Sequence, residues 1–221
     1  MIPESGGGPG IMLSMAEIVV FVHGLYMTGV EFGLLRRRVE AAGFATQRYH
    51  YHSLLRSVDE NAMLLADHLK SISTERLHLV GHSLGGLVIL RMFQRGVTLP
   101  PGRVVFMGAP VRGSQAAVNL KDRGWGFLLG RSGPEGLTLP HSAEWKEPRE
   151  LGVIAGTHAF SINPLQPVLP APHDGVVSLE ETRIAGAKDS IELHLAHTTM
   201  LFSKQLAEQV SGFLKDGRFR R

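Results

Sequence analysis

The sequence contains no cysteine among its 221 residues. Disulfides, thiolate metal sites and a cysteine nucleophile are therefore excluded. No apolar run approaches the ~20 residues that a membrane-spanning helix requires, so we expect no membrane span. The glycine-rich beginning of the chain lacks the basic start and continuous apolar stretch of a secretory signal. We therefore expect a flexible leader over residues 1–16 and a cytoplasmic protein.

Charge of either sign is also sparse. Charged residues make up 19% of the chain, and the net charge of +3 is spread along the sequence. The one basic cluster ends in a tail over residues 218–221, which we expect to be solvated rather than to touch an anionic surface. No phosphate-binding loop, dinucleotide fingerprint or aromatic-basic nucleic-acid surface is present in the sequence. We therefore expect no cofactor and no nucleic-acid partner.

Short β-branched runs alternate along the chain with helical patterns. This alternation is typical of an α/β fold in which helices cover both faces of a mostly parallel sheet. Ser57 and Glu60 have the spacing of a capping box before one helix, and Gly43 is placed to end another. The length fits one domain over residues 17–217. We expect about six strands, at 18–22, 46–51, 77–80, 104–107, 151–155 and 191–195.

Gly81-His82-Ser83-Leu84-Gly85 matches the pattern G-x-S-x-G between an apolar strand and an apolar helix. So sharp a turn forces the serine into a strained backbone conformation, and glycine at both ends lets the neighbouring backbones approach closely. The turn lifts the hydroxyl above the carboxyl edge of the sheet, at the N-terminus of a helix. The pattern predicts Ser83 as a nucleophile rather than an incidental serine in a glycine-rich turn.

These residues resemble the α/β-hydrolase family, and within it the compact lipases and esterases, from about Ile18 to Leu214. Four further segments carry the resemblance. They are Val22-His23-Gly24-Leu25, similar to the family's oxyanion loop; Gly108-Ala109-Pro110-Val111-Arg112-Gly113-Ser114, similar to the segment after the next strand; Asp174-Gly175-Val176-Val177, similar to the acid turn; and His194-Leu195-Ala196-His197, similar to the terminal strand and histidine loop.

The resemblance implies a catalytic triad, because a serine hydroxyl needs an adjacent base to take its proton. The family's chain order is Ser, then acid, then His. His197 fits the base best, since it follows the last expected strand, and His194 ranks second because we expect that strand to bury it. Asp174 fits the acid, in the loop after the strand at 151–155. The rivals for the acid are Asp189, at the start of the last strand and on the opposite edge, and Glu180 and Glu181.

The resemblance also implies an oxyanion hole made of backbone N–H groups. We expect one from Leu84 and one from Leu25, with Tyr26 as an alternative to Leu25. Two such donors stabilise the negative charge that develops on the carbonyl oxygen in the transition state.

Residues 111–150 interrupt the alternation, and inserts at this point form the lid in many relatives of the resembled family. Glycines there could act as hinges, and the apolar run between them could line an acyl pocket. We expect Tyr26, Trp125, Phe127 and Leu128 to contact the substrate. The alternative is that the insert simply packs onto the domain.

We expect no metal site, since His50 and His52 share one face of an expected strand but no third ligand is evident. The function expected is hydrolysis of a small-molecule carboxylic ester through a covalent acyl-enzyme. Acyl transfer, thioester or amide cleavage, and non-catalytic binding on the same scaffold stay open as alternatives. The sequence does not decide the oligomeric state or the acyl chain length.

Overall fold

The computed structural model describes residues 17–138, 144–159 and 169–221. They form one six-stranded sheet in the order β2-β1-β3-β4-β5-β6, and every pair of neighbouring strands is parallel. The sheet predicted from the alternating pattern is therefore confirmed. Its strands are β1 (Glu17–Val22), β2 (Ala45–Tyr49), β3 (Arg76–His82), β4 (Val104–Met107), β5 (Leu151–Gly156) and β6 (Asp189–Leu193).

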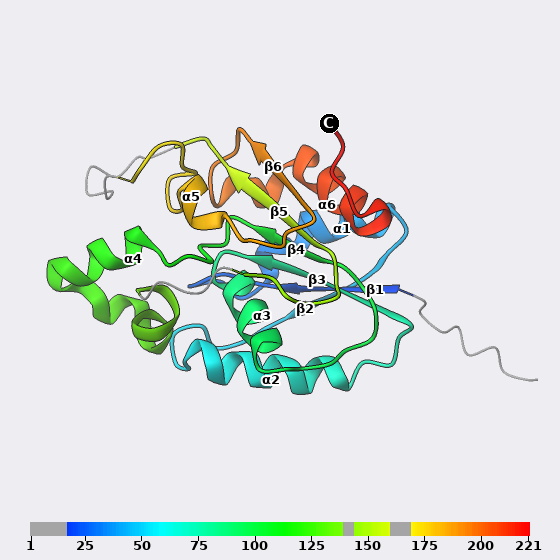
Figure 1. The fold of residues 1–221 in the computed structure, drawn as a ribbon, viewed down its shortest axis with the longest axis horizontal. Helices are drawn as coiled ribbons and strands as arrows, with labels where there is room; N and C mark the ends of the chain where they lie inside the picture. Colours follow the sequence, from blue (N-terminus) through cyan, green and yellow to red (C-terminus); the bar gives the residue numbers. More distant parts are fainter. Residues whose placement is uncertain (1–16, 139–143, 160–168) are drawn as a thin grey trace, which may run out of the picture.

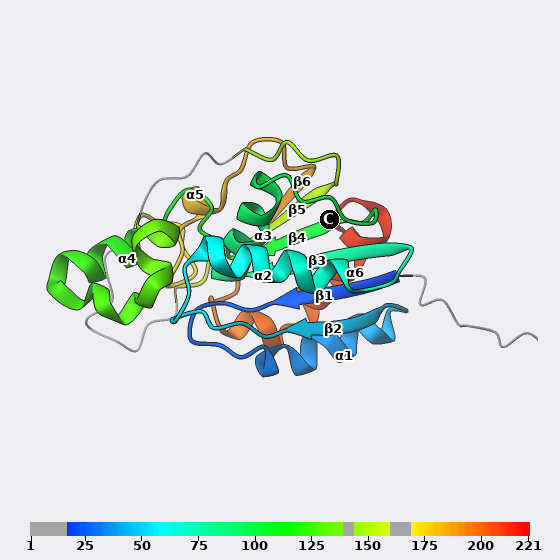
Figure 2. The same cartoon turned by 90° about the horizontal axis from the view of Figure 1, so that it is seen from below.

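Helices cover both faces of the sheet, as the sequence predicts. The helices α1 and α6 pack together on one face, and α2 and α3 pack together on the other (Figures 1 and 2). Shorter helices lie in the connections. The bounds are α1 (Gly33–Ala41), α2 (Val58–Lys70), α3 (Leu84–Gln94), α4 (Gln115–Leu120), α5 (Leu179–Thr182) and α6 (Lys204–Asp216).

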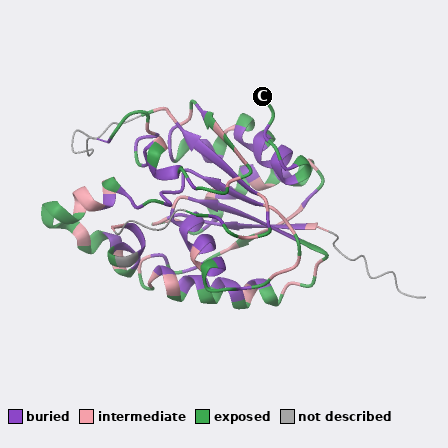
Figure 3. Ribbon diagram, viewed as in Figure 1, coloured by how far each residue is buried: buried purple, intermediate pink, exposed green. Residues whose placement is uncertain are grey.

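Alternating side chains of the strands build two separate cores. On β1, Val20 and Val22 pack with α2 and α3, whereas Val19 and Phe21 pack with α1 and α6. All four side chains are fully buried, because successive residues of a strand point to opposite faces of the sheet. The four inner strands, β1, β3, β4 and β5, are accordingly almost continuously buried (Figure 3). Burial on both faces explains why these strands are near-continuous apolar runs.

The predicted helix signals are present. The Ser57 side chain accepts a hydrogen bond from the Glu60 N–H, and the Glu60 carboxylate accepts one from the Ser57 N–H, which completes a capping box before α2. Gly43, just after α1, has a φ of 101°, a conformation that only glycine adopts readily. Both signals are local, so the sequence alone was enough to locate them.

The strand order reverses between β1 and β3. The chain runs from β1 outward to β2 and then crosses over β1 to β3, so that β1 and β3 are neighbours whose connections leave in opposite directions. In open α/β sheets this switch point leaves a crevice at the carboxyl ends of the strands. His23 follows β1 and Ser83 follows β3 at this edge.

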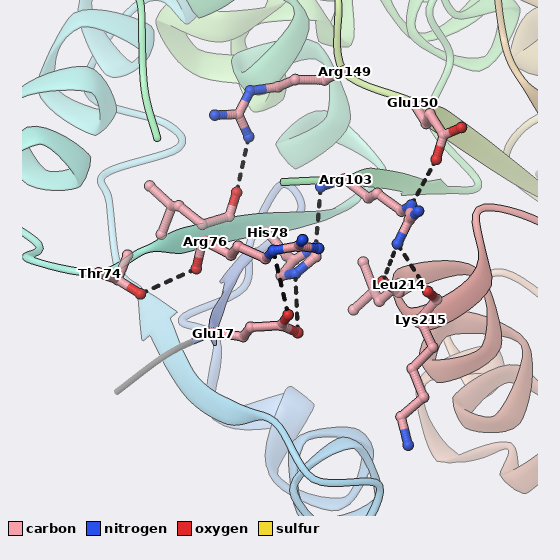
Figure 4. Close-up of polar contacts among 10 residues, drawn as sticks. Glu17, Thr74, Arg76, His78, Arg103, Arg149, Glu150, Leu214 and Lys215 are labelled. Atoms are coloured by element: carbon pink, nitrogen blue, oxygen red, sulfur yellow. Dashed lines mark hydrogen bonds and ion pairs between the residues drawn. The ribbon is translucent and has the colours of Figure 1, made fainter. Parts of the chain in front are cut away.

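Polar contacts link the elements at the other end of the sheet, where the strands begin (Figure 4). Arg103 donates to the Glu150 carboxylate at 2.6 Å and to the main-chain oxygens of Leu214 and Lys215 at 2.9 Å. A cation on the last carbonyls of a helix is favoured by the helix dipole, so Arg103 fixes the end of α6 against the sheet. Arg149 donates to the Leu77 oxygen at 2.8 Å.

Within the insert predicted at 111–150, the segment from α4 to Leu137 extends beyond the carboxyl ends of the strands (Figure 2). After α4 it continues as a series of short 3₁₀ and π turns between Lys121 and Leu137. Its second half is fastened to the β2–α2 connection. The Arg131 N–H donates to the Leu54 oxygen at 2.9 Å, and the Ser132 hydroxyl donates to the Ser53 oxygen at 2.7 Å. The described part of the insert is thus a packed extension, and its role as a lid stays a prediction.

Four expectations concern the ends of the strands and of the chain. The strand predicted at 46–51 ends at Tyr49, and the strand predicted at 191–195 ends at Leu193. In the tail at 218–221, Arg218, Arg220 and Arg221 are exposed, as expected, whereas the Phe219 side chain is buried and Arg221 also pairs with Asp189 at 2.7 Å. The predicted leader, 1–16, lies outside the described residues. None of the helices in the described ranges combines the length and the hydrophobicity that a membrane span requires.

Candidate active site

Ser83 occupies the turn between β3 and α3 in a strained conformation, with φ 53° and ψ −123°. Glycine is required at positions 81 and 85 because neighbouring backbone atoms approach them closely. A Cβ on Gly81 would lie 2.7 Å from the Gly86 nitrogen, and one on Gly85 would overlap the Val22 carbonyl oxygen. The chain can make this turn only with glycine at both positions. Strain of this kind is typical of functional residues, and here it holds the serine at the crevice.

The structure brings Asp174 and His197 into direct contact. The His197 Nδ1–H donates to Asp174 Oδ2 at 2.7 Å, and the His197 backbone N–H donates to the main-chain oxygen of Asp174 at 2.9 Å. Both residues are buried. The carboxylate therefore fixes the proton on Nδ1, which leaves Nε2 as the unprotonated nitrogen of the neutral ring.

The other carboxylate oxygen of Asp174 is held by the backbone. Oδ1 accepts hydrogen bonds from the N–H groups of Val176 at 2.9 Å and Val177 at 2.8 Å. Burial alone would raise the pKa of Asp174. The neighbouring His197 and these two N–H donors outweigh burial, so the pKa lies below its usual value. Asp174 is thus an anion at neutral pH, fixed in orientation by three donors.

Gly108, directly after β4, lets the main chain pass beside this pair. Its φ is 54°, and a Cβ there would lie 3.0 Å from Asp174 Oδ2 and 3.2 Å from His197 Nδ1. Any larger residue would press on the hydrogen bond between Asp174 and His197. This contact explains why a glycine begins the Gly108-Ala109-Pro110 segment that the sequence singled out.

Leu25 and Leu84, the residues predicted to supply the oxyanion N–H groups, line the same cavity as Ser83. Leu84 is the first residue of α3, so its N–H has no partner within the helix. Leu25 lies in the turn after β1. The start of that turn is braced, because the Tyr51 hydroxyl donates to the His23 oxygen at 2.7 Å and the Tyr51 N–H donates to His23 Nε2 at 3.2 Å.

One cavity of about 330 Å³ contains the predicted catalytic and oxyanion residues except the buried Asp174. Ser83 and His197 both line it, although no hydrogen bond joins their side chains among the described contacts. In substrate-free enzymes such bonds are often long and tighten only when substrate binds. The walls of the cavity are mainly apolar. They include Leu25, Met27, Leu84, Pro110, Ala117, Leu120, Leu129, Leu137, Val176 and Val177.

Of the four residues predicted to contact substrate, only Tyr26 lines this cavity. Trp125, Phe127 and Leu128 lie on the insert with exposed side chains, Phe127 being 77% exposed. The neighbouring insert residues Leu129 and Leu137 line the cavity instead.

The rival residues lie in other contacts. Asp189 accepts hydrogen bonds from the Phe219 N–H at 2.8 Å and from Arg221 at 2.7 Å, at the far edge of the sheet. Glu180 pairs with Arg112 and Arg183. Glu181 caps the start of α5. His194 was expected inside a strand, but β6 ends one residue earlier, so His194 is exposed and its ring packs on His158.

His82, at the variable position of the serine motif, contacts the predicted base, and the sequence did not reveal this contact. Its Nε2–H donates to the His197 main-chain oxygen at 3.1 Å, and the two rings lie 4.7 Å apart. Burial lowers the pKa of His82 to about 3, so this ring is neutral beside His197. The brace between His23 and Tyr51 was also missed. The variable position of the serine motif was the only signal for His82, and nothing local pointed to Tyr51.

His50 and His52 lie beyond the end of β2 rather than on one strand face. Their rings are 5.5 Å apart, and His50 also stacks on His23. Within the described ranges, no group of three or more histidine or acidic side chains is arranged to hold a metal ion.

The fold is similar to that of a lipase from Bacillus licheniformis, with a TM-score of 0.70 and 17% identity over 90% of each chain. It is also similar to carboxylesterase CesB from Bacillus subtilis, with a TM-score of 0.62 and 12% identity over 91% of this chain and 84% of that chain. The type II thioesterase BorB from the borrelidin biosynthetic cluster has a TM-score of 0.60 and 13% identity, over 90% of this chain and 92% of that chain.

At these identities the structural likeness shows the fold alone. A search of curated proteins finds no match. The sequence does match the model of the alpha/beta hydrolase family over residues 19–204, from within β1 to the first residue of α6. Because this match spans most of the chain, the protein belongs to the alpha/beta hydrolase family.

Proposed function

We propose that this protein hydrolyses carboxylic esters through a covalent acyl-enzyme formed on Ser83. The observation that carries the proposal is the 2.7 Å hydrogen bond between Asp174 and His197 beside the cavity that Ser83 lines. A base oriented by a buried carboxylate, next to a serine in a strained turn, is the arrangement that activates a hydroxyl.

In the proposed mechanism His197 Nε2 takes the proton of Ser83 as the hydroxyl attacks the ester carbonyl. Asp174 keeps the other proton on Nδ1 and stabilises the imidazolium that forms. His197 then gives its proton to the departing alcohol, and the same nitrogen activates the water that hydrolyses the acyl-enzyme. The carboxylate stays ionised throughout, in keeping with its lowered pKa.

The negative charge on the carbonyl oxygen is proposed to be held by the N–H groups of Leu25 and Leu84. The N-terminus of α3 adds its dipole at the same place. Preformed backbone donors of this kind need no reorganisation during the reaction, and losing one lowers turnover by about 10²- to 10³-fold in hydrolases.

The cavity supports an acyl group of limited size. Its volume of about 330 Å³ is near the lower end of the roughly 300–1,000 Å³ typical of small-molecule sites. Its walls are mainly apolar, which favours an aliphatic acyl chain over a charged one. We therefore propose short acyl esters as the preferred substrates.

The test is a series of nitrophenyl esters from acetate to palmitate, run with the wild-type chain and with Ser83→Ala. We expect turnover to be highest for short chains and to fall by several orders of magnitude in the variant, with an unchanged circular dichroism spectrum. Activity that survives in Ser83→Ala would overturn the proposal.

Matched probes separate the alternatives that share the same residues. A thioester series in place of the esters measures whether the leaving group is a thiol, and added alcohol or amine acceptors measure partitioning toward acyl transfer. A wild-type chain that binds these substrates but turns none of them over, and that resists a fluorophosphonate, would instead indicate a non-catalytic binding protein.

A further inference from the structure

Tyr26 shares an unusual feature with Ser83. They are the two non-glycine residues with positive φ in the described chain, at 62° and 53°. Both line the same cavity. The left-handed conformation is unfavourable for a residue with a side chain and persists only where the surroundings enforce it. The turn between β3 and α3 enforces it at Ser83, so Tyr26 requires a restraint of its own.

Burial does not supply this restraint, because the Tyr26 side chain is 59% exposed. A hydrogen bond does: the Tyr26 hydroxyl donates to the main-chain oxygen of Leu128, 102 positions away on the insert. The insert is itself held a few residues later, where Arg131 and Ser132 bond to the β2–α2 connection. Tyr26 is therefore attached to an anchored part of the insert.

The other end of the same loop is anchored too. Tyr51 holds the main-chain oxygen and the ring of His23. Gly24 and Leu25 lie between these two attachment points. A Cβ on Gly24 would lie only 3.1 Å from the Ser83 Cβ, which shows how closely the loop passes the serine. The position of the Leu25 N–H is consequently fixed from both sides.

We propose that Tyr26 is a positioning residue that ties the oxyanion loop to the insert. Its hydroxyl, bonded to the Leu128 oxygen, holds Tyr26 in its strained conformation and thereby aims the Leu25 N–H into the cavity. This inference rests on the proposed function, because it takes Leu25 as an oxyanion donor. It makes the insert a support of the catalytic machinery.

Tyr26→Phe tests the proposal, since it removes only the hydroxyl and keeps the ring in the cavity wall. We expect kcat for nitrophenyl acetate and butyrate to fall by about 10-fold with KM nearly unchanged, because an oxyanion donor acts mainly in the transition state. The loss should be equal for the two acyl groups. Tyr49→Phe is the matched control: Tyr49 lies on β2 outside the cavity, and its variant should keep wild-type kcat.

Hydrogen–deuterium exchange gives a second readout that does not depend on activity. In Tyr26→Phe, the loop at 24–28 and the insert at 126–130 should both exchange faster, while β1 should not change. A wild-type chain that cleaves no ester would end the proposed function, yet the exchange would still decide whether the tether exists. Unchanged exchange, or a KM that changes with acyl length at constant kcat, would show that Tyr26 is only a wall of the cavity.

Discussion

Replacing Asp174 by asparagine should abolish most activity without unfolding the protein, and the structure dictates why. The two backbone donors at 2.8 and 2.9 Å, from Val177 and Val176, face Oδ1 and require an acceptor there. The asparagine must therefore turn its carbonyl oxygen toward them. Its NH₂ group then faces His197 Nδ1 in place of the Oδ2 that is 2.7 Å away.

That orientation reverses the tautomer of His197. Nδ1 must accept from the amide, so the ring proton moves to Nε2, and Nε2 can no longer take the proton of Ser83. In a serine protease the same change lowers kcat by about 10⁴-fold, equivalent to about 5 kcal/mol of activation free energy. We expect a loss of the same order here, because Asp174 is almost fully buried and no solvent contact can restore the tautomer.

The assay compares kcat/KM of Asp174→Asn with that of Asp189→Asn on the best ester substrate. Asp189 lies at the opposite edge of the sheet and bonds to the C-terminal tail, so its variant should stay within about 2-fold of wild type in activity. Thermal unfolding checks that both variants fold. The reasoning is refuted if Asp174→Asn retains more than a tenth of the activity, or if the Asp189 variant shows the large loss.

The remaining predictions concern stability. Gly85→Ala should destabilise the fold by at least about 1–3 kcal/mol in urea titration, because its Cβ would overlap the β1 backbone. Gly33→Ala is the control and should be neutral or stabilising, because its Cβ meets nothing within 4 Å. Equal effects of the two substitutions on the free energy of unfolding would contradict the close-approach argument. Burial lowers the pKa of His82 to about 3 and of His78 to about 4, so between those values and pH 6.5 the unfolded chain binds protons that the folded chain refuses. The free energy of unfolding should therefore fall as pH drops below 6.5, by up to about 1.4 kcal/mol per pH unit per histidine, and His82→Gln should flatten the slope measured by urea titration from pH 8 to 4.

The elements that the sequence predicted well are those set by local patterns. Strands β1, β3, β4 and β5 are buried on both faces and are therefore near-continuous apolar runs. The capping box at Ser57 needs only residues three apart. The serine turn needs small residues at fixed positions, and the steric reason for Gly81 and Gly85 holds in the structure.

What the sequence could not supply are contacts between distant segments. Strand β2 ends at Tyr49 because Tyr51 leaves the sheet to form a hydrogen bond with His23, 28 positions earlier in the sequence. The contact of His82 with the His197 carbonyl joins positions 115 apart. Apolar character alone could not tell that Phe127 faces outward while Leu129 faces the cavity, since the turns of the insert follow no helical period.

The most direct measurement is the site and rate of reaction with a fluorophosphonate, read by mass spectrometry of the intact and digested protein. We predict one adduct on the peptide containing Ser83, absent in Ser83→Ala and formed at least about 10³-fold more slowly in His197→Ala, because the serine loses its base. An unlabelled wild-type chain, an adduct on another residue, or equal rates with and without His197 would contradict the central claim.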